Sequence, residues 1–167
     1  MLIQEKKGNL NLLENPNKTV DWLALEWFET RKRILRKKTV SGLDISLKFL
    51  NENAALTQGD ILFEDEKSIV AIEVLACSCL VIQANSMFEM ASVCYEIGNK
   101  HLPLFFENDE LLVPFENPMQ RLLVAQGYTV RIENRKLLHA LRTTVSPHAM
   151  DESKSLFSRI LKLGADA

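Results

Sequence analysis

The sequence predicts an α+β protein whose first half is built from β-strands and whose second half mixes strands with two helices. Two observations lead to this fold class. Short runs of β-branched and aromatic residues, separated by turn signals, fill the region before residue 76. After residue 78, strand-like and helical periodicities alternate in the order β-α-β-β-α-β.

Residues 1–76 are expected to form an N-terminal antiparallel β domain. Ile45, Leu47 and Phe49 alternate with polar residues, which is typical of a strand with one wet face. Ser41-Gly42 lies between two strand-like runs and predicts a hairpin turn. A second hairpin is expected to join strands over residues 60–63 and 69–74.

Residues 77–142 are expected to form a second domain, beginning with an apolar strand over 78–84. Ser86 then caps a helix, and Glu89 follows at the spacing of a capping box. Gly98-Asn99 is expected to end this helix. Its buried stripe is expected to consist of Met87, Met90, Ala91, Cys94 and Ile97.

Two more strands, over 102–106 and 110–115, precede the second helix of this domain. Asn117 is expected to cap that helix, with Pro118 at its first position and Gly127 after its end. A last strand covers 128–132, so the order is that of a ferredoxin-like βαββαβ domain. Residues 143–167 are expected to form a flexible C-terminal tail.

Composition excludes several classes of function. The formal net charge of −2 over 167 residues gives no global field that would attract nucleic acid or an anionic membrane. The apolar runs are shorter than the roughly 18 residues of a spanning helix, and the first residues lack a signal-peptide core. Three cysteines, an odd number, suit a reducing compartment. We therefore expect a cytoplasmic protein with no nucleic-acid and no membrane partner.

One segment of the first half is strongly basic; we call residues 31–38 the basic segment, which contains Arg31, Lys32, Arg33, Arg36, Lys37 and Lys38. On a strand such charges most often form a solvated face or protect a sheet edge. The alternative is a docking surface for an acidic protein partner. Nucleic-acid binding is disfavoured because aromatic residues are not interleaved with the charges.

Few residues have the spacing of a chemical site. His101 lies just past the predicted helix end, where an isolated histidine is more often a surface residue than a ligand. Cys77 and Cys79 would point to the same face of a strand; a metal role is conceivable, and core packing is favoured. A nucleophilic pair of Cys94 and His101 would indicate an enzyme, but the apolar surroundings of Cys94 argue against it. We expect no catalytic residues.

Five stretches of the chain together resemble the UreE family of urease accessory proteins, which act as nickel metallochaperones. They are Glu96-Ile97-Gly98-Asn99-Lys100-His101, Leu112-Val113-Pro114-Phe115-Glu116-Asn117-Pro118, Asp21-Trp22-Leu23-Ala24-Leu25-Glu26-Trp27, Lys32-Arg33-Ile34-Leu35-Arg36-Lys37 and Gln58-Gly59-Asp60-Ile61-Leu62. The resemblance covers roughly residues 1–130, and more loosely the region up to residue 148.

The resemblance implies a homodimer in which the histidine of the Gly-Asn-x-His motif, His101 here, lies at the two-fold axis. Both copies then reach one Ni(II) ion, for which Cu(II) or Zn(II) can substitute. A tail histidine completes the site in some members; His148 is the best match, and His139 is the fallback. The implied partners are the accessory GTPase and the urease activation complex. The alternative is a metal-independent interaction module that docks a partner through its basic β face.

The chain departs from the family at its end, because it lacks the histidine-rich tract with which many members store several ions. Secondary metal positions on the hairpin after the motif are also doubtful, because Glu110, Leu111 and Leu112 occupy that region. About one ion per dimer is therefore expected.

Overall fold

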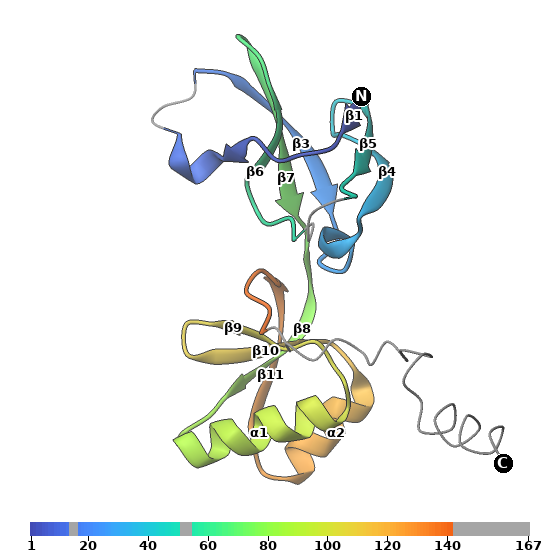
Figure 1. Ribbon diagram of the computed structural model, residues 1–167. Helices are drawn as coiled ribbons and strands as arrows, with labels where there is room; N and C mark the ends of the chain where they lie inside the picture. The colour runs from blue at the N-terminus through green and yellow to red at the C-terminus, as the bar shows by residue number, and fades with distance from the viewer. Residues whose placement is uncertain (14–16, 51–54, 142–167) are drawn as a thin grey trace, which may run out of the picture.

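Three β-sheets and two α-helices make up the computed structural model, which describes residues 1–13, 17–50 and 55–141 (Figure 1). The elements in chain order are β1 (Leu2–Ile3), β2 (Gly8–Asn9), the 3-10 turn η1 (Leu10–Leu12), β3 (Thr19–Leu25), the 3-10 turn η2 (Glu29–Arg31), β4 (Ile34–Lys38), β5 (Asp44–Lys48), β6 (Asp60–Glu64), β7 (Ser68–Val74), β8 (Ala76–Gln83), α1 (Met87–Asn99), β9 (Phe105–Glu107), β10 (Glu110–Pro114), α2 (Asn117–Ala125) and β11 (Thr129–Lys136). No helix among these residues is long and apolar enough to cross a membrane.

The N-terminal strands form two small sheets, with orders β1-β5-β4 and β2-β6-β7-β3. Both predicted hairpins are present: β4 pairs antiparallel with β5 around Gly42, whose φ is +92°, and β6 pairs antiparallel with β7. β1 and β3 instead pair in parallel, with β5 and β7 respectively. The region is thus mixed rather than wholly antiparallel, because turn signals fix the direction of strands joined by hairpins but not of strands joined by longer connections.

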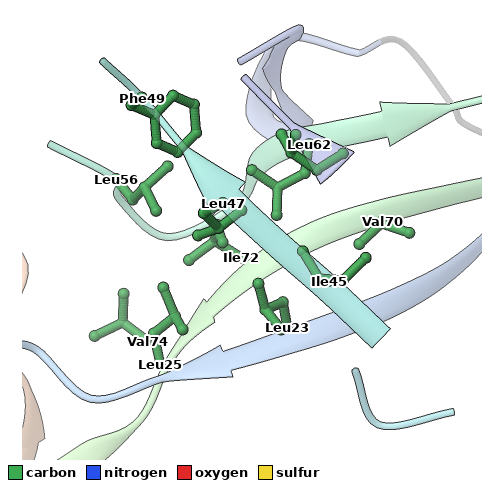
Figure 2. Close-up of a cluster of buried hydrophobic side chains, with 11 residues drawn as sticks. Leu23, Leu25, Ile45, Leu47, Phe49, Leu56, Leu62, Val70, Ile72 and Val74 are labelled. Carbon is green, nitrogen blue, oxygen red and sulfur yellow. The ribbon is translucent and has the colours of Figure 1, made fainter. Parts of the chain in front are cut away.

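An apolar core lies between these two sheets. Ile45 and Leu47 of β5 face Leu23 of β3 and Ile72 of β7, as Figure 2 shows, and each of the four side chains is no more than 1% exposed. Buried apolar residues alternate with more exposed polar residues along β5, as predicted, because the polar residues lie on the opposite face of the strand. The hydrophobic pattern of this strand therefore determines which face meets the other sheet.

The C-terminal sheet has the strand order β11-β8-β10-β9, and all its pairings are antiparallel. Numbered within this region, the order is 4-1-3-2, which is the predicted ferredoxin-like arrangement. Both helices lie on one face of the sheet (Figure 1). They bury Val93 and Ile97 of α1 and Leu123 of α2 against Leu80 and Ile82 of β8.

The turn of the β9–β10 hairpin and the start of α2 both depend on the residue types found there. The hairpin turns through Asn108 and Asp109, with φ of +50° and +62°, as a two-residue turn requires. The structure places the N-cap of α2 at Glu116 and not at the predicted Asn117, which lies inside the helix. Glu116 makes no side-chain capping hydrogen bond, so Pro118 is the stronger start signal.

The other face of the C-terminal sheet contacts the N-terminal strands. The ring of Trp27 meets that of Phe105 edge to face, with centroids 5.7 Å apart. Leu138 packs against the N-terminal core, and the Nζ of Lys136 lies 3.4 Å from a carboxylate oxygen of Glu73. Aromatic, apolar and ionic contacts therefore join the two parts.

Candidate metal centre

His101 lies directly after α1, in the tight turn that ends the helix. Its φ is +55°, in the left-handed region. The His101 N–H donates to the Gly98 carbonyl at 2.9 Å, and the Leu102 N–H donates to the Ile97 carbonyl at 3.3 Å. These two bonds define a Schellman motif, with His101 as the first residue past the cap. Leu102 and Ile97 also belong to one apolar cluster, which supplies the hydrophobic contact typical of this motif.

Histidine occupies a backbone position that glycine fits best. A left-handed conformation costs a residue with a β-carbon roughly 1–2 kcal/mol, although His, Asn and Asp tolerate it better than most. α1 ends at Asn99, as the Gly98-Asn99 pair predicted, but the left-handed position after it is occupied by a histidine and not by a glycine. The His101 side chain is exposed. The turn therefore presents an imidazole to solvent from a backbone that two hydrogen bonds hold in place, and strain of this kind is found at functional sites.

One chain does not complete a metal site around His101. Within residues 1–13, 17–50 and 55–141, no group of three or more His, Cys, Asp or Glu side chains is placed to hold an ion. A single imidazole supplies one nitrogen, whereas nickel, copper and zinc take four or more ligands. A metal ion at His101 would therefore need further ligands from another chain or from residues outside the described ranges.

His139 lies in a short segment that extends the edge of the C-terminal sheet. The Phe106 N–H donates to the His139 carbonyl at 3.0 Å, and the Leu141 N–H donates to the Leu104 carbonyl at 2.8 Å. An antiparallel bridge lies between these bonds. The exposed His139 side chain lines a cavity of about 410 Å³ together with Trp27, at the contact between the two parts of the chain.

The direction in which this segment runs bears on whether His139 or His148 can approach His101. The pairing is antiparallel, so the chain approaches the His101 end of the β9 edge as it runs from His139 to Leu141. His148 lies outside the described residues, seven positions after Leu141. Seven extended residues span at most about 24 Å. The last described residues, from His139 to Leu141, thus run toward the side of the sheet that carries His101.

The three cysteines are free thiols in apolar surroundings. Burial, with the neighbouring Cys77 as a smaller cause, raises the pKa of Cys79 to about 11. Burial also raises the pKa of Cys77 and of Cys94. Because thiolate is the form that binds metals and attacks electrophiles, these side chains are poor ligands and poor nucleophiles. Cys79 is fully buried and Cys77 packs beside it, so the prediction of core packing is confirmed.

The outward face of α1 is apolar, which the sequence reasoning missed. Met87 is 89% exposed, Phe88 81% and Tyr95 70%. With the exposed Ala91, they form what we call the α1 stripe, since positions 87, 88, 91 and 95 share one side of a helix. Met87 and Ala91 were wrongly assigned to the buried face.

The buried face of α1 consists instead of Val93 and Ile97, with Met90 and Cys94 partly buried beside them. The aromatic residues Phe88 and Tyr95, seven positions apart, were the signal for a second apolar stripe. Exposed apolar patches of this kind mark interaction surfaces. The α1 stripe lies on the helix whose C-terminal turn carries His101.

Comparisons with known proteins identify both parts of the chain. Residues 3–75 match the N-terminal domain of the UreE urease accessory protein, and residues 78–145 match its C-terminal domain. The urease accessory protein UreE of Flavobacterium johnsoniae is 42% identical over 163 residues, which cover 98% of this chain and 99% of that protein. Those of Helicobacter pylori strain G27 and Helicobacter acinonychis are 43% and 44% identical, with 89–90% of each chain covered. The predicted resemblance is thus confirmed, and the chain belongs to the UreE family of urease accessory proteins, which are chaperones and not enzymes.

Proposed function

We propose that two copies of this chain bind one Ni(II) ion between their His101 side chains and deliver it during assembly of the urease active site. The observation that carries the proposal is the placement of His101. The Schellman turn fixes its backbone, and its imidazole is exposed at the end of the helix that bears the α1 stripe. Family membership supplies the link to urease.

Two-fold symmetry explains how one exposed histidine can serve as a metal ligand. A contact between identical surfaces presents each residue twice, so one His101 per chain becomes a pair of nitrogen ligands. Burial of Phe88 and Tyr95 against a second copy would supply the apolar contact that one chain lacks. In this proposal residues 77–142 bind metal and form the dimer, and residues 1–76 form a partner-binding domain; the predicted tail, residues 143–167, lies outside the described residues.

His148 is the proposed additional ligand, and His139 is the fallback. The direction of residues 139–141, toward the His101 side of the sheet, supports His148, whereas His139 is held opposite Phe106. Two to four imidazoles leave coordination positions of a six-coordinate nickel ion open to water. An acceptor ligand can enter such a position before a donor leaves, which suits a protein that hands its cargo on. Cu(II) and Zn(II) also accept imidazole and can substitute in vitro.

The proposed recipients are the accessory GTPase and the urease activation complex, with this chain acting in the cytoplasm. The three free cysteines agree with a reducing compartment. Neither nucleic acid nor a membrane is part of the proposal. A metal-independent interaction module is the competing function, and metal binding separates the two.

Equilibrium dialysis against nickel, copper and zinc tests the proposal. The unaltered protein should take up about one nickel ion per two chains, and His101→Ala should lose this binding while its circular dichroism spectrum is unchanged. His139→Ala distinguishes the two tail histidines: it removes one exposed imidazole and should leave nickel uptake unaltered if His148 is the additional ligand, and lower it if His139 is. Nickel affinity of His101→Ala equal to that of the unaltered protein would contradict the proposal.

A further inference from the structure

β4 is an edge strand whose outward main-chain groups have no partner strand among the described residues. The Phe49 N–H donates to the Arg33 carbonyl at 2.8 Å, and the Thr39 N–H donates to the Leu43 carbonyl at 2.9 Å. In an antiparallel pair, residues that bond the partner alternate with residues that face away. The odd-numbered residues 33–39 therefore bond β5, and the N–H and C=O groups of Ile34, Arg36 and Lys38 point outward.

The hydrogen bonds of β5 agree with this assignment. Ser46 lies opposite Arg36, and its N–H donates to the Met1 carbonyl on the far side of β5 at 2.8 Å. Arg36 and Ser46 thus form a pair without mutual main-chain bonds. The main chain of Arg36 is available to an additional strand.

The side chains along this edge are exposed and mostly basic. Ile34 is 63% exposed, and Arg36 and Lys38 are also exposed. Within the basic segment, Lys32 and Lys37 lie near Glu29, and Lys38 lies near Asp44. Arg31, Arg33 and Arg36 form no ion pair in the part of the chain that the structure describes.

We propose that the β4 edge docks an extended acidic segment of a partner protein, which adds a strand to the β1-β5-β4 sheet. Main-chain pairing supplies the fixed geometry of such a complex, and alternate side chains supply its specificity. The positive charges of the basic segment determine which kind of partner can bind at the β4 edge. Carboxylates on one face of the added strand would meet the unpaired Arg36 and its same-face neighbour Lys38, whereas a second copy of the same edge would bring like charges together. Nucleic acid could meet the arginines but cannot continue a β-sheet.

Fluorescence anisotropy with a labelled eight-residue peptide that alternates glutamate and valine tests the inference. Arg36→Ala removes one charge and should weaken binding about two- to fivefold. Arg36→Pro removes the same charge and also the outward N–H, so it should weaken binding by about tenfold or more. Proline is tolerated on an edge strand where its nitrogen faces outward. Arg121→Ala, an exposed arginine of α2, is the control and should bind as the unaltered protein does.

A second probe tests main-chain pairing without altering the protein. The same peptide with every main-chain nitrogen methylated keeps its charge and side chains but cannot donate hydrogen bonds, so it should not bind. Equal affinity for the methylated peptide, or equal effects of Arg36→Ala and Arg36→Pro, would overturn the strand addition. Binding of a 20-nucleotide thymidine strand in preference to the acidic peptide would overturn the choice of partner. Nickel uptake should be the same in all these variants, so the outcome is independent of the proposed metal site.

Discussion

Replacing His101 by glycine should make the protein more stable while it removes the proposed metal ligand. The reason lies in the backbone, since His101 has a φ of +55° and glycine adopts this conformation without a steric cost. The exposed imidazole makes no hydrogen bond or ion pair to the other described residues. Its loss should therefore cost little stability in the metal-free protein.

The expected magnitude follows from two opposing effects. Relief of the left-handed strain stabilises the folded chain by roughly 1–2 kcal/mol. The greater freedom of glycine in the unfolded chain offsets about 0.4–1 kcal/mol of this. The net gain in the free energy of unfolding should be about 0.5–1 kcal/mol, which raises Tm by about 1–4 °C in a chain of this length. His101→Ala keeps a β-carbon at the same φ and should change stability by less than about 0.5 kcal/mol.

Urea unfolding, followed by circular dichroism with EDTA present and at one protein concentration, measures the effect without contributions from bound metal. Gly98→Ala is the matched control one turn earlier. Gly98 lies inside α1, and a β-carbon there would meet no atom within 4 Å, so alanine should stabilise it by up to about 1 kcal/mol. Glycine is thus expected to stabilise the protein at position 101, and alanine at position 98. A loss of more than about 1 kcal/mol in His101→Gly would refute the argument, because it would mean that the imidazole stabilises the fold.

Four further outcomes are expected. His148→Ala should weaken nickel binding in calorimetry without abolishing it, and an unchanged dissociation constant would exclude the tail as a ligand source. Phe88→Glu, on the α1 stripe, should weaken self-association about tenfold or more in sedimentation, with an unaltered dimer constant as the contrary result. Because an ion shared by two copies binds only the dimer, free nickel at a hundred times its dissociation constant should tighten dimerisation about 100-fold; no change would place the ion within one chain. Burial raises the pKa of Cys79 from 9.0 to about 11, so stability should be intact below pH 9 and fall as the pH rises toward 11, a fall that Cys79→Ala should lessen in urea unfolding.

The parts of the fold that the sequence predicted are those governed by local patterns. The alternation of Ile45 and Leu47 predicted the buried face of β5, and the turns at Gly42 and Gly127 predicted where neighbouring elements separate. The Ser86 cap was also present, since its hydroxyl accepts a hydrogen bond from the Glu89 N–H at 3.1 Å, while the Glu89 carboxylate accepts from the Asn85 N–H at 2.7 Å. Each of these features depends on residues within a few positions of one another.

The missed features depend on partners distant in the chain. The two-residue strand β1 pairs with β5, 44 positions away, and nothing in Leu2-Ile3 alone indicates this. The segment from His139 to Leu141 joins the β9 edge through pairing with a distant strand in the same way. The outward face of α1 was mistaken for core because helical periodicity shows that a face is apolar but not what covers it.

The candidate site was predictable in identity but not in geometry. The motif around His101 was recognisable as a sequence, and its Gly98-Asn99 pair was expected to end the helix, which α1 does at Asn99. The left-handed turn that follows the helix is made by His101 and not by a glycine. The usual preference for glycine at the helix end is broken at the residue proposed to bind metal. Local rules are expected to fail where function selects the residue.

Two features of α1 are unfavourable for an isolated chain, and their proximity is itself an argument for an interface. The left-handed His101 costs folding free energy, and the exposed rings of Phe88 and Tyr95 keep apolar surface in water. Either feature alone could be incidental, because single exposed apolar residues are common. Their occurrence on one helix and its terminal turn is accounted for if the same surface covers the rings and presents the imidazole to a second copy. A fold shaped only by the stability of one chain would place glycine at position 101 and polar residues at positions 88 and 95.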